Sequence, residues 1–69
     1  MDRTERFYKI DQLLNERRSV PMETLIEELG ISRATVKRDI EYMRDRLSAP
    51  ISWDRSLRGY CFDKSLPGA

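Results

Sequence analysis

LIEELGISRATVKRDI, residues 25–40, is the stretch of this sequence that decides the expected fold. The apolar residues before Gly30 recur at helical spacing, and Gly30 supplies the positive φ that ends a helix at little cost. Ser32 can cap the helix that follows, because its side-chain oxygen can accept a hydrogen bond from a backbone N–H of the first turn. The stretch therefore predicts two helices joined by a tight glycine turn.

The second of these helices is predicted over residues 33–47. At about 100° per residue its apolar side chains share one narrow stripe that faces a core; they are Val36, Ile40, Met43 and Leu47. Cations near the helix start lie on a separate arc of the helical wheel: Arg33, Lys37 and Arg38. Such a helix, with an apolar base and long cationic donors outside, can enter a DNA major groove about 12 Å wide.

The rest of the chain predicts one more helix and a hairpin. The first helix opens at Asp2, whose carboxylate can cap it, and ends near Arg18. Helix two begins about Pro21, because proline is tolerated only in the first turn of a helix. ISWD (51–54) and GYCFD (59–63) alternate apolar and polar residues, which is typical of paired strands. The expected fold class is mainly α with a small β-hairpin.

The apolar strand residues are expected to lie on one face and to cover the helices: Ile51, Trp53, Tyr60 and Phe62. Aromatic residues on a sheet can instead stack on single-stranded bases. We favour core packing here, because without these side chains the hairpin has nothing to hold it against the helices.

Composition argues against catalysis. The 69 residues allow one small domain, and they include no histidine and one cysteine. The sequence has no glycine-rich phosphate loop and no carboxylates at metal-ligand spacing, so neither an enzyme nor a cofactor is expected.

No apolar run is long enough for a membrane span, and a cytoplasmic protein is expected. Cys61 is expected to be a buried or half-buried thiol.

The net charge of +1 hides an asymmetry along the chain. Residues 1–30 hold five basic and seven acidic side chains, a net charge of −2, whereas residues 31–60 hold seven basic and four acidic ones, a net charge of +3. The positive excess lies in the half that contains the cationic helix and the hairpin. This distribution favours a nucleic-acid partner, although the excess is small.

The order of three helices and a hairpin, with SRATVKRDI opening the third helix and Gly59-Tyr60-Cys61-Phe62 in the last strand, resembles a known family. It is similar to the winged helix-turn-helix domain of bacterial transcription regulators of the DeoR type, and most of all to that of WYL-domain regulators. The resemblance covers about residues 3–63. It implies that residues 1–63 are the DNA-binding domain, and that residues 64–69 begin a linker to a C-terminal domain that senses a ligand.

The resemblance also implies a site. The third helix, residues 33–47, would read the major groove, and the hairpin, residues 51–62, would be a wing on the adjacent backbone or minor groove. The implied DNA contacts are Ser32, Arg33, Thr35, Lys37, Arg38, Arg55 and Arg58. The partner would be double-stranded DNA, with a palindromic operator and a homodimeric, nucleoid-associated regulator, a repressor, in the full-length protein.

For single residues of this set, more than one role is open. Arg33 or Arg38 is expected to read guanine, whereas Lys37 is expected to neutralise phosphate. Ser32 can equally be a cap and nothing more. Asp39 is expected to pair with a neighbouring arginine, because a carboxylate has no use against phosphate.

A winged helix that binds another protein is the competing hypothesis, since a fold does not fix a function. The exposed arc of the third helix offers cations rather than an apolar patch, which favours DNA. Leu57, at the tip of the hairpin, is the exposed apolar residue that favours protein contact.

Overall fold

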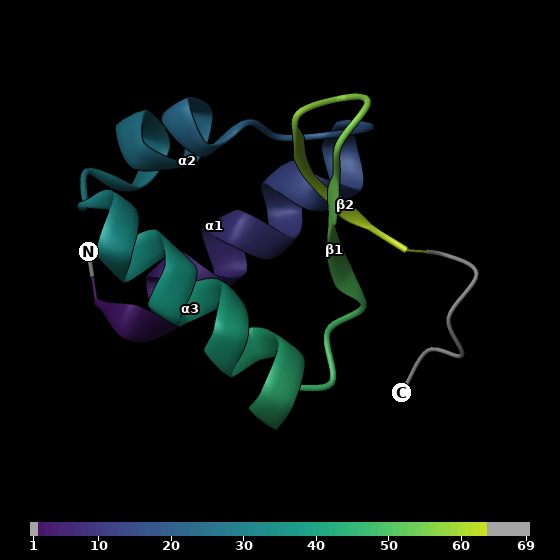
Figure 1. Cartoon of the computed structure of the whole chain (residues 1–69). Helices are drawn as coiled ribbons and strands as arrows, with labels where there is room; N and C mark the ends of the chain where they lie inside the picture. Colours follow the sequence, from purple (N-terminus) through teal and green to yellow (C-terminus); the bar gives the residue numbers. More distant parts are fainter. Residues whose placement is uncertain (1, 64–69) are drawn as a thin grey trace.

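The computed structural model describes residues 2–63, which form three helices followed by an antiparallel two-stranded hairpin. Figure 1 shows α1 crossing behind α3, with the hairpin beside the helices. The predicted fold class is confirmed, and the predicted linker, residues 64–69, lies outside the described residues. The elements are α1 (Arg3–Glu16), α2 (Met22–Leu29), α3 (Arg33–Arg46), β1 (Ile51–Asp54) and β2 (Gly59–Phe62).

Side-chain and backbone caps fix the helix ends. The Asp2 carboxylate accepts a hydrogen bond from the Glu5 N–H at 2.8 Å, as expected of an N-cap. α1 ends at Glu16, slightly before the expected Arg18. Gly30 closes α2 with a φ of 64°, and this left-handed conformation turns the chain directly into α3.

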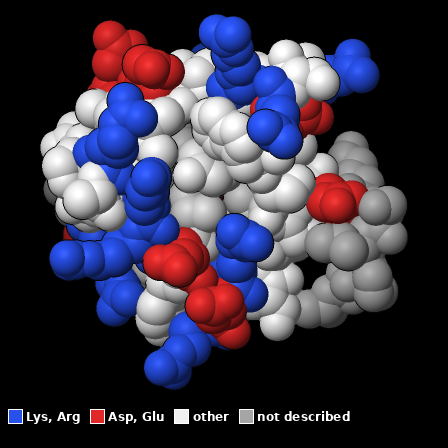
Figure 2. Space-filling view, in the orientation of Figure 1, with Lys and Arg blue, Asp and Glu red and all other residues white. Residues whose placement is uncertain are grey.

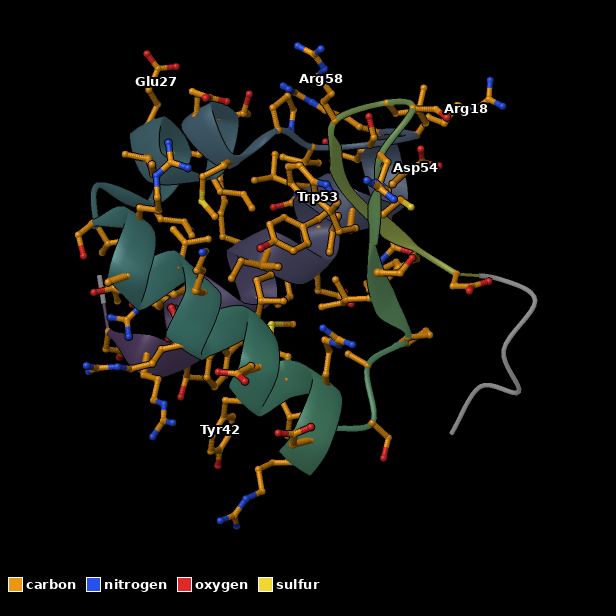
Figure 3. All side chains as sticks on the ribbon, in the orientation of Figure 1. Arg18, Glu27, Tyr42, Trp53, Asp54 and Arg58 are labelled. Carbon is orange, nitrogen blue, oxygen red and sulfur yellow. The ribbon has the colours of Figure 1, made fainter. Side chains whose placement is uncertain are left out.

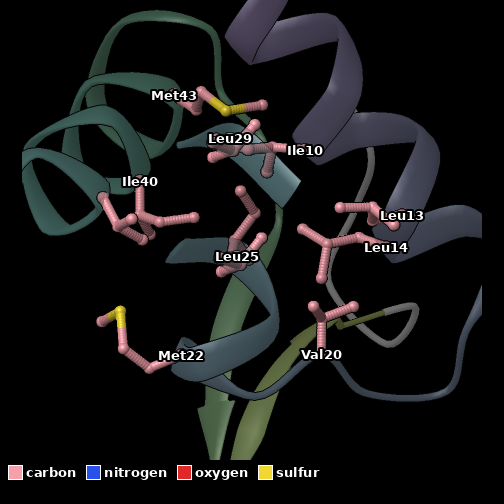
Figure 4. Close-up of a cluster of buried hydrophobic side chains, with 11 residues drawn as sticks. Ile10, Leu13, Leu14, Val20, Met22, Leu25, Leu29, Ile40 and Met43 are labelled. Atoms are coloured by element: carbon pink, nitrogen blue, oxygen red, sulfur yellow. The ribbon is translucent and has the colours of Figure 1, made fainter. Parts of the chain in front are cut away.

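The buried apolar side chains of the three helices meet in one core, shown in Figure 4. Because each helix buries a single stripe, the outer faces stay free for other contacts. Leu47, predicted to complete the stripe of α3, is 51% exposed, so that expectation was wrong. It is the C-cap of a helix that ends at Arg46, and the last buried side chain of this helix is that of Met43. The core consists of Ile10, Leu13, Leu14, Val20, Met22, Leu25, Leu29, Val36, Ile40, Met43 and Ile51.

A backbone bridge holds the hairpin against the helices. Val20, in the connection between α1 and α2, donates to the Tyr60 carbonyl at 2.8 Å and accepts from the Tyr60 N–H at 2.9 Å. Gly59 makes this approach possible: a Cβ built there would lie 3.0 Å from the carbonyl carbon and oxygen of Val20. The two strands pair from Ile51 with Phe62 to Asp54 with Gly59.

The expectation that Trp53 belongs to the core was wrong, since its side chain is 47% exposed. Ile51 is buried, whereas Tyr60 and Phe62 are half-buried and pack against the core. Only the beginning of β1 rests on the helices, and Trp53 lies two residues further toward the loop. It contacts its cross-strand neighbour Tyr60 edge to face, with ring centroids 4.9 Å apart.

Candidate nucleic-acid interface

The outer face of α3 begins with exposed basic side chains. Arg33, Lys37 and Arg38 are exposed, and Ala34 between them is exposed as well. Figure 2 shows basic side chains over α3 and over the hairpin loop, with acidic side chains further along α3. The sequence predicted this exposed cationic start of the helix from its apolar spacing alone.

Ser32 and Thr35 form the cap of α3. The Ser32 hydroxyl oxygen accepts from the Thr35 N–H at 3.2 Å, and the two hydroxyl oxygens lie 3.0 Å apart. One hydroxyl must donate to the other, so one hydroxyl hydrogen of the pair remains to donate outward. The predicted cap is confirmed, and the pair can offer a phosphate one donor.

The hairpin loop projects two cations, Arg55 and Arg58, which are both exposed. The Asp54 carboxylate accepts from the Leu57 N–H at 3.0 Å, and Arg58 has a φ of 53°, which turns the chain back into β2. Figure 3 shows Arg58 at the end of the loop. The sequence pattern identified the loop but not the carboxylate that shapes it.

A crevice of about 610 Å³ separates the hairpin from the starts of α2 and α3. We call it the wing crevice. It brings together three of the predicted site residues, one from α3 and two from the hairpin loop. Its lining consists of Pro21, Met22, Glu23, Arg33, Trp53, Arg55, Leu57 and Arg58.

The other predicted residues of α3 are not part of this crevice. Thr35 and Arg38 line a recess of about 550 Å³ on the α1 side of the helix, together with Arg3 and Arg6. Lys37 lines neither hollow. The predicted set therefore spreads across α3, from the hairpin on one side to α1 on the other.

Asp39 forms the predicted ion pair, and its partner comes from α1. Arg6 donates to Asp39 through Nε at 2.7 Å and through Nη2 at 3.3 Å. The hydrogen bond to Asp39 raises the pKa of the Arg6 guanidinium above its usual value. The buried carboxylate is thereby neutralised at the inner face of α3, and it does not oppose the cations on the outer face.

Arg3 extends the basic surface of α3 onto α1. Its guanidinium lies 4.0 Å from the ring centroid of Tyr42 and 5.4 Å from that of Phe7, and these two rings stack on each other. Figure 3 shows Tyr42 on α3. Sequence reasoning missed this cluster, because Arg3 and Tyr42 become neighbours only when α1 packs against α3.

Tyr60 is a half-buried phenol of β2 whose pKa is perturbed. Burial raises the pKa of its hydroxyl above the usual 10.0, and the positive charges of Arg44 and Arg33 lower it. The phenol therefore lies within electrostatic reach of two α3 arginines. Arg44 is an exposed residue of α3.

A groove on another side of the molecule is apolar. It has a volume of about 810 Å³ and lies between α1, the end of α3 and the loop that leads to β1. Tyr8 and Leu47, which are 72% and 51% exposed, both line it, and Phe62 borders it from β2. No residue of the hairpin loop enters this groove.

Cys61 is half-buried, as expected, and its sulfur lies 3.8 Å from the Ser52 hydroxyl. Within residues 2–63 no group of three or more histidine, cysteine, aspartate or glutamate side chains is placed to hold a metal ion. In the same range, no helix has both the length and the apolar content of a membrane span.

Comparison with known proteins agrees with this geometry. No curated protein and no solved structure matches the chain. The family model for the helix-turn-helix (HTH) domain matches residues 5–61, which include α2, α3, all of α1 except its first two residues, and almost the whole hairpin. This match covers most of the chain, and DNA is the partner of this kind of domain. The chain belongs to the HTH domain family.

Proposed function

We propose that this chain is the sequence-specific, double-stranded DNA-binding N-terminal domain of a bacterial transcription regulator of the DeoR type with a WYL domain. The observation that carries the proposal is the pairing of Arg33, on α3, with Arg55 and Arg58, on the hairpin loop, across one crevice. An α-helix fits the major groove, and a hairpin beside it reaches the adjacent backbone or minor groove.

The residues of the site take different roles in this proposal. Arg33 or Arg38 reads a base, since a guanidinium can donate two hydrogen bonds to guanine. Lys37, Arg55 and Arg58 neutralise phosphates. The Ser32–Thr35 pair donates its remaining hydroxyl hydrogen to the backbone, which fixes the register of α3 on the duplex.

The regulator acts as a homodimer on a palindromic operator, in the cytoplasm where bacterial DNA lies. A single small module buries about 600 to 1,000 Å² on DNA, so two copies on one operator raise the affinity. Repression follows if the operator overlaps a promoter.

Fluorescence anisotropy with labelled duplexes tests the proposal. The chain is titrated with a selected duplex and with a random pool over a range of salt concentrations. Preference for the selected duplex is expected, together with a loss of about 0.9 log units of affinity per phosphate contact for each tenfold rise in salt.

A matched pair of variants locates the surface. Lys37→Ala/Arg38→Ala and Arg17→Ala/Arg18→Ala each remove two exposed, adjacent cations. Arg17 and Arg18 line a recess that contains no α3 residue. We expect the first variant to lose selective binding and the second to keep it. Equal losses would place the DNA elsewhere.

Protein contact is the second candidate function, and the apolar groove beside Tyr8 and Leu47 favours it. The double variant Tyr8→Ala/Leu47→Ala removes two exposed apolar side chains from this groove and leaves the basic side chains of α3 and of the hairpin loop unchanged. Duplex binding that survives in this variant assigns DNA recognition to the other surface. A folded chain that binds no duplex even at low salt favours protein contact instead.

A further inference from the structure

Trp53 occupies an unusual position for the single tryptophan of a small domain. Nearly half of its side chain is exposed, and it lines the wing crevice rather than the core. Figure 3 shows it between the hairpin and the helices, with Arg58 beyond it at the end of the loop. Within residues 2–63 its indole N–H makes no hydrogen bond. An apolar ring with a free donor therefore faces the space between α3 and the hairpin.

The indole is held in place from the strand side. Trp53 lies directly opposite Tyr60 in the antiparallel register, and the two rings meet at an interplanar angle of 75°. Such edge contacts add about 0.5 to 1.5 kcal/mol beyond the area they bury. Tyr60 is itself anchored by its two backbone hydrogen bonds to Val20. The donor is thus positioned before any partner arrives.

The charges of the crevice select an anion. Arg33, Arg55 and Arg58 line it, against one carboxylate, that of Glu23. The lining thus carries more positive than negative charge, so the crevice favours an anion. A DNA backbone presents phosphate oxygens, which accept hydrogen bonds, next to the apolar faces of deoxyribose. An indole complements both.

We propose that Trp53 contacts the DNA backbone in the wing crevice, with its indole N–H donating to a phosphate oxygen and its ring covering the adjacent deoxyribose. This inference rests on the proposed function and adds a neutral contact to the cationic ones. A neutral donor fixes the position of the strand without adding a counterion-release term. Trp53 therefore sets how closely the hairpin approaches the duplex.

The single tryptophan makes the contact directly measurable. Acrylamide quenching of Trp53 fluorescence is recorded for the free chain and for the chain saturated with the selected duplex. Labelled-DNA anisotropy in parallel samples reports binding itself. We expect quenching to weaken in the complex, because the backbone covers the exposed part of the indole. This measurement needs no variant and so does not depend on how a substitution affects folding.

Trp53→Phe then tests the donor. Phenylalanine keeps an aromatic ring against Tyr60 but cannot donate a hydrogen bond. A hydrogen bond to a charged group is the stronger kind, so we expect affinity to fall about tenfold to a hundredfold. The dependence of affinity on salt should not change, since no charge is lost. Tyr8→Phe is the matched control: it removes a donor from an exposed aromatic outside the crevice and should leave affinity unchanged.

Each other outcome overturns the proposal in a distinguishable way. If the duplex binds while quenching and Trp53→Phe affinity stay unchanged, DNA recognition stands and Trp53 takes no part in it. If Trp53→Phe lowers both the affinity and the salt dependence, the hairpin cations have moved, and the role of Trp53 is only to support them. If no duplex binds, both the proposed function and the Trp53 contact fail.

Discussion

Replacing Gly59 with alanine tests how the hairpin is held against the helices. The φ of Gly59 lies outside the left-handed region, so alanine can adopt this backbone conformation. Space is the obstacle: the new Cβ would lie 3.0 Å from two backbone atoms of Val20 and 3.1 Å from a third. A backbone cannot move aside as the end of a flexible side chain can. The hairpin and the α1–α2 connection must therefore separate.

The size of the expected loss in folding stability follows from this geometry. Ordinary contact begins near 3.4 Å, so the segments must part by about 0.4 Å, which stretches hydrogen bonds that now measure 2.8 and 2.9 Å. Overpacking of this kind costs about 1 to 3 kcal/mol, and the lower entropy of alanine in the unfolded chain returns about 0.4 to 1 kcal/mol. These two contributions leave a net loss between about 0 and 2.6 kcal/mol, and the stretched hydrogen bonds add to it, so we expect about 1 to 2 kcal/mol. A domain of this size has only about 3 to 5 kcal/mol to lose.

Thermal unfolding followed by circular dichroism measures this loss. For a small domain the expected change corresponds to a fall in Tm of about 4 to 16 °C. Ser56→Ala, at an exposed position in the same hairpin, is the control and should change stability by less than about 0.5 kcal/mol. A Gly59→Ala variant as stable as the parent would refute the reasoning, because the close approach to Val20 would then impose no constraint.

Three further predictions concern the basic residues of α3, the hydroxyl of Tyr60 and the ion pair between α1 and α3. Arg38→Ala should cost about 1 to 3 kcal/mol on the preferred duplex and relax one base preference, whereas Lys37→Ala should weaken binding to every sequence and reduce the salt slope by about one. Competition titrations check both, and equal losses on preferred and random DNA for Arg38→Ala would contradict its role as a base reader. Because burial raises the pKa of Tyr60, the folded state holds that proton more tightly; the resulting stability is complete below the unfolded pKa of 10.0 and declines as pH rises above it. Urea unfolding of the parent and of Tyr60→Phe on either side of pH 10 should show a smaller decline in the variant. Asp39→Ala and Arg6→Ala should each destabilise the fold, and the double variant should lose less than their sum, since each single change leaves the other charge unpaired; an additive double-mutant cycle would show that the pair is not coupled.

Local chemistry explains why much of the fold was predictable from sequence. The turn at Gly30 and the cap at Ser32 depend on residues within a few positions of each other, and both were found as expected. The exposed cations at the start of α3 follow from the same helical period that buries Val36 and Ile40. Each of these inferences needs only the geometry of one helix and its ends.

The errors and omissions arise where distant segments meet. Alternation along β1 correctly grouped Ile51 with Trp53, but only packing determines how far along the strand the core extends. The bridge from Val20 involves one residue, and a single residue has no periodicity to detect. Asp39 was expected to find an arginine, yet its partner Arg6 becomes a neighbour only when α1 crosses α3. The wing crevice was missed for the same reason.

The outer face of α3 is separated energetically from the fold that carries it. Ala34, Lys37 and Arg38 are exposed, and within residues 2–63 none of them makes an ion pair or a side-chain hydrogen bond. Substitutions at such positions change folding free energy by less than about 0.5 kcal/mol, whereas a base contact of the kind proposed for Arg38 is worth about 1 to 3 kcal/mol. If Arg38 reads a base as proposed, an exchange at this position changes the preferred operator while the scaffold stays constant. On the proposed function, the same independence allows the DNA preference of the domain to be altered through exposed side chains of α3 at little cost in stability.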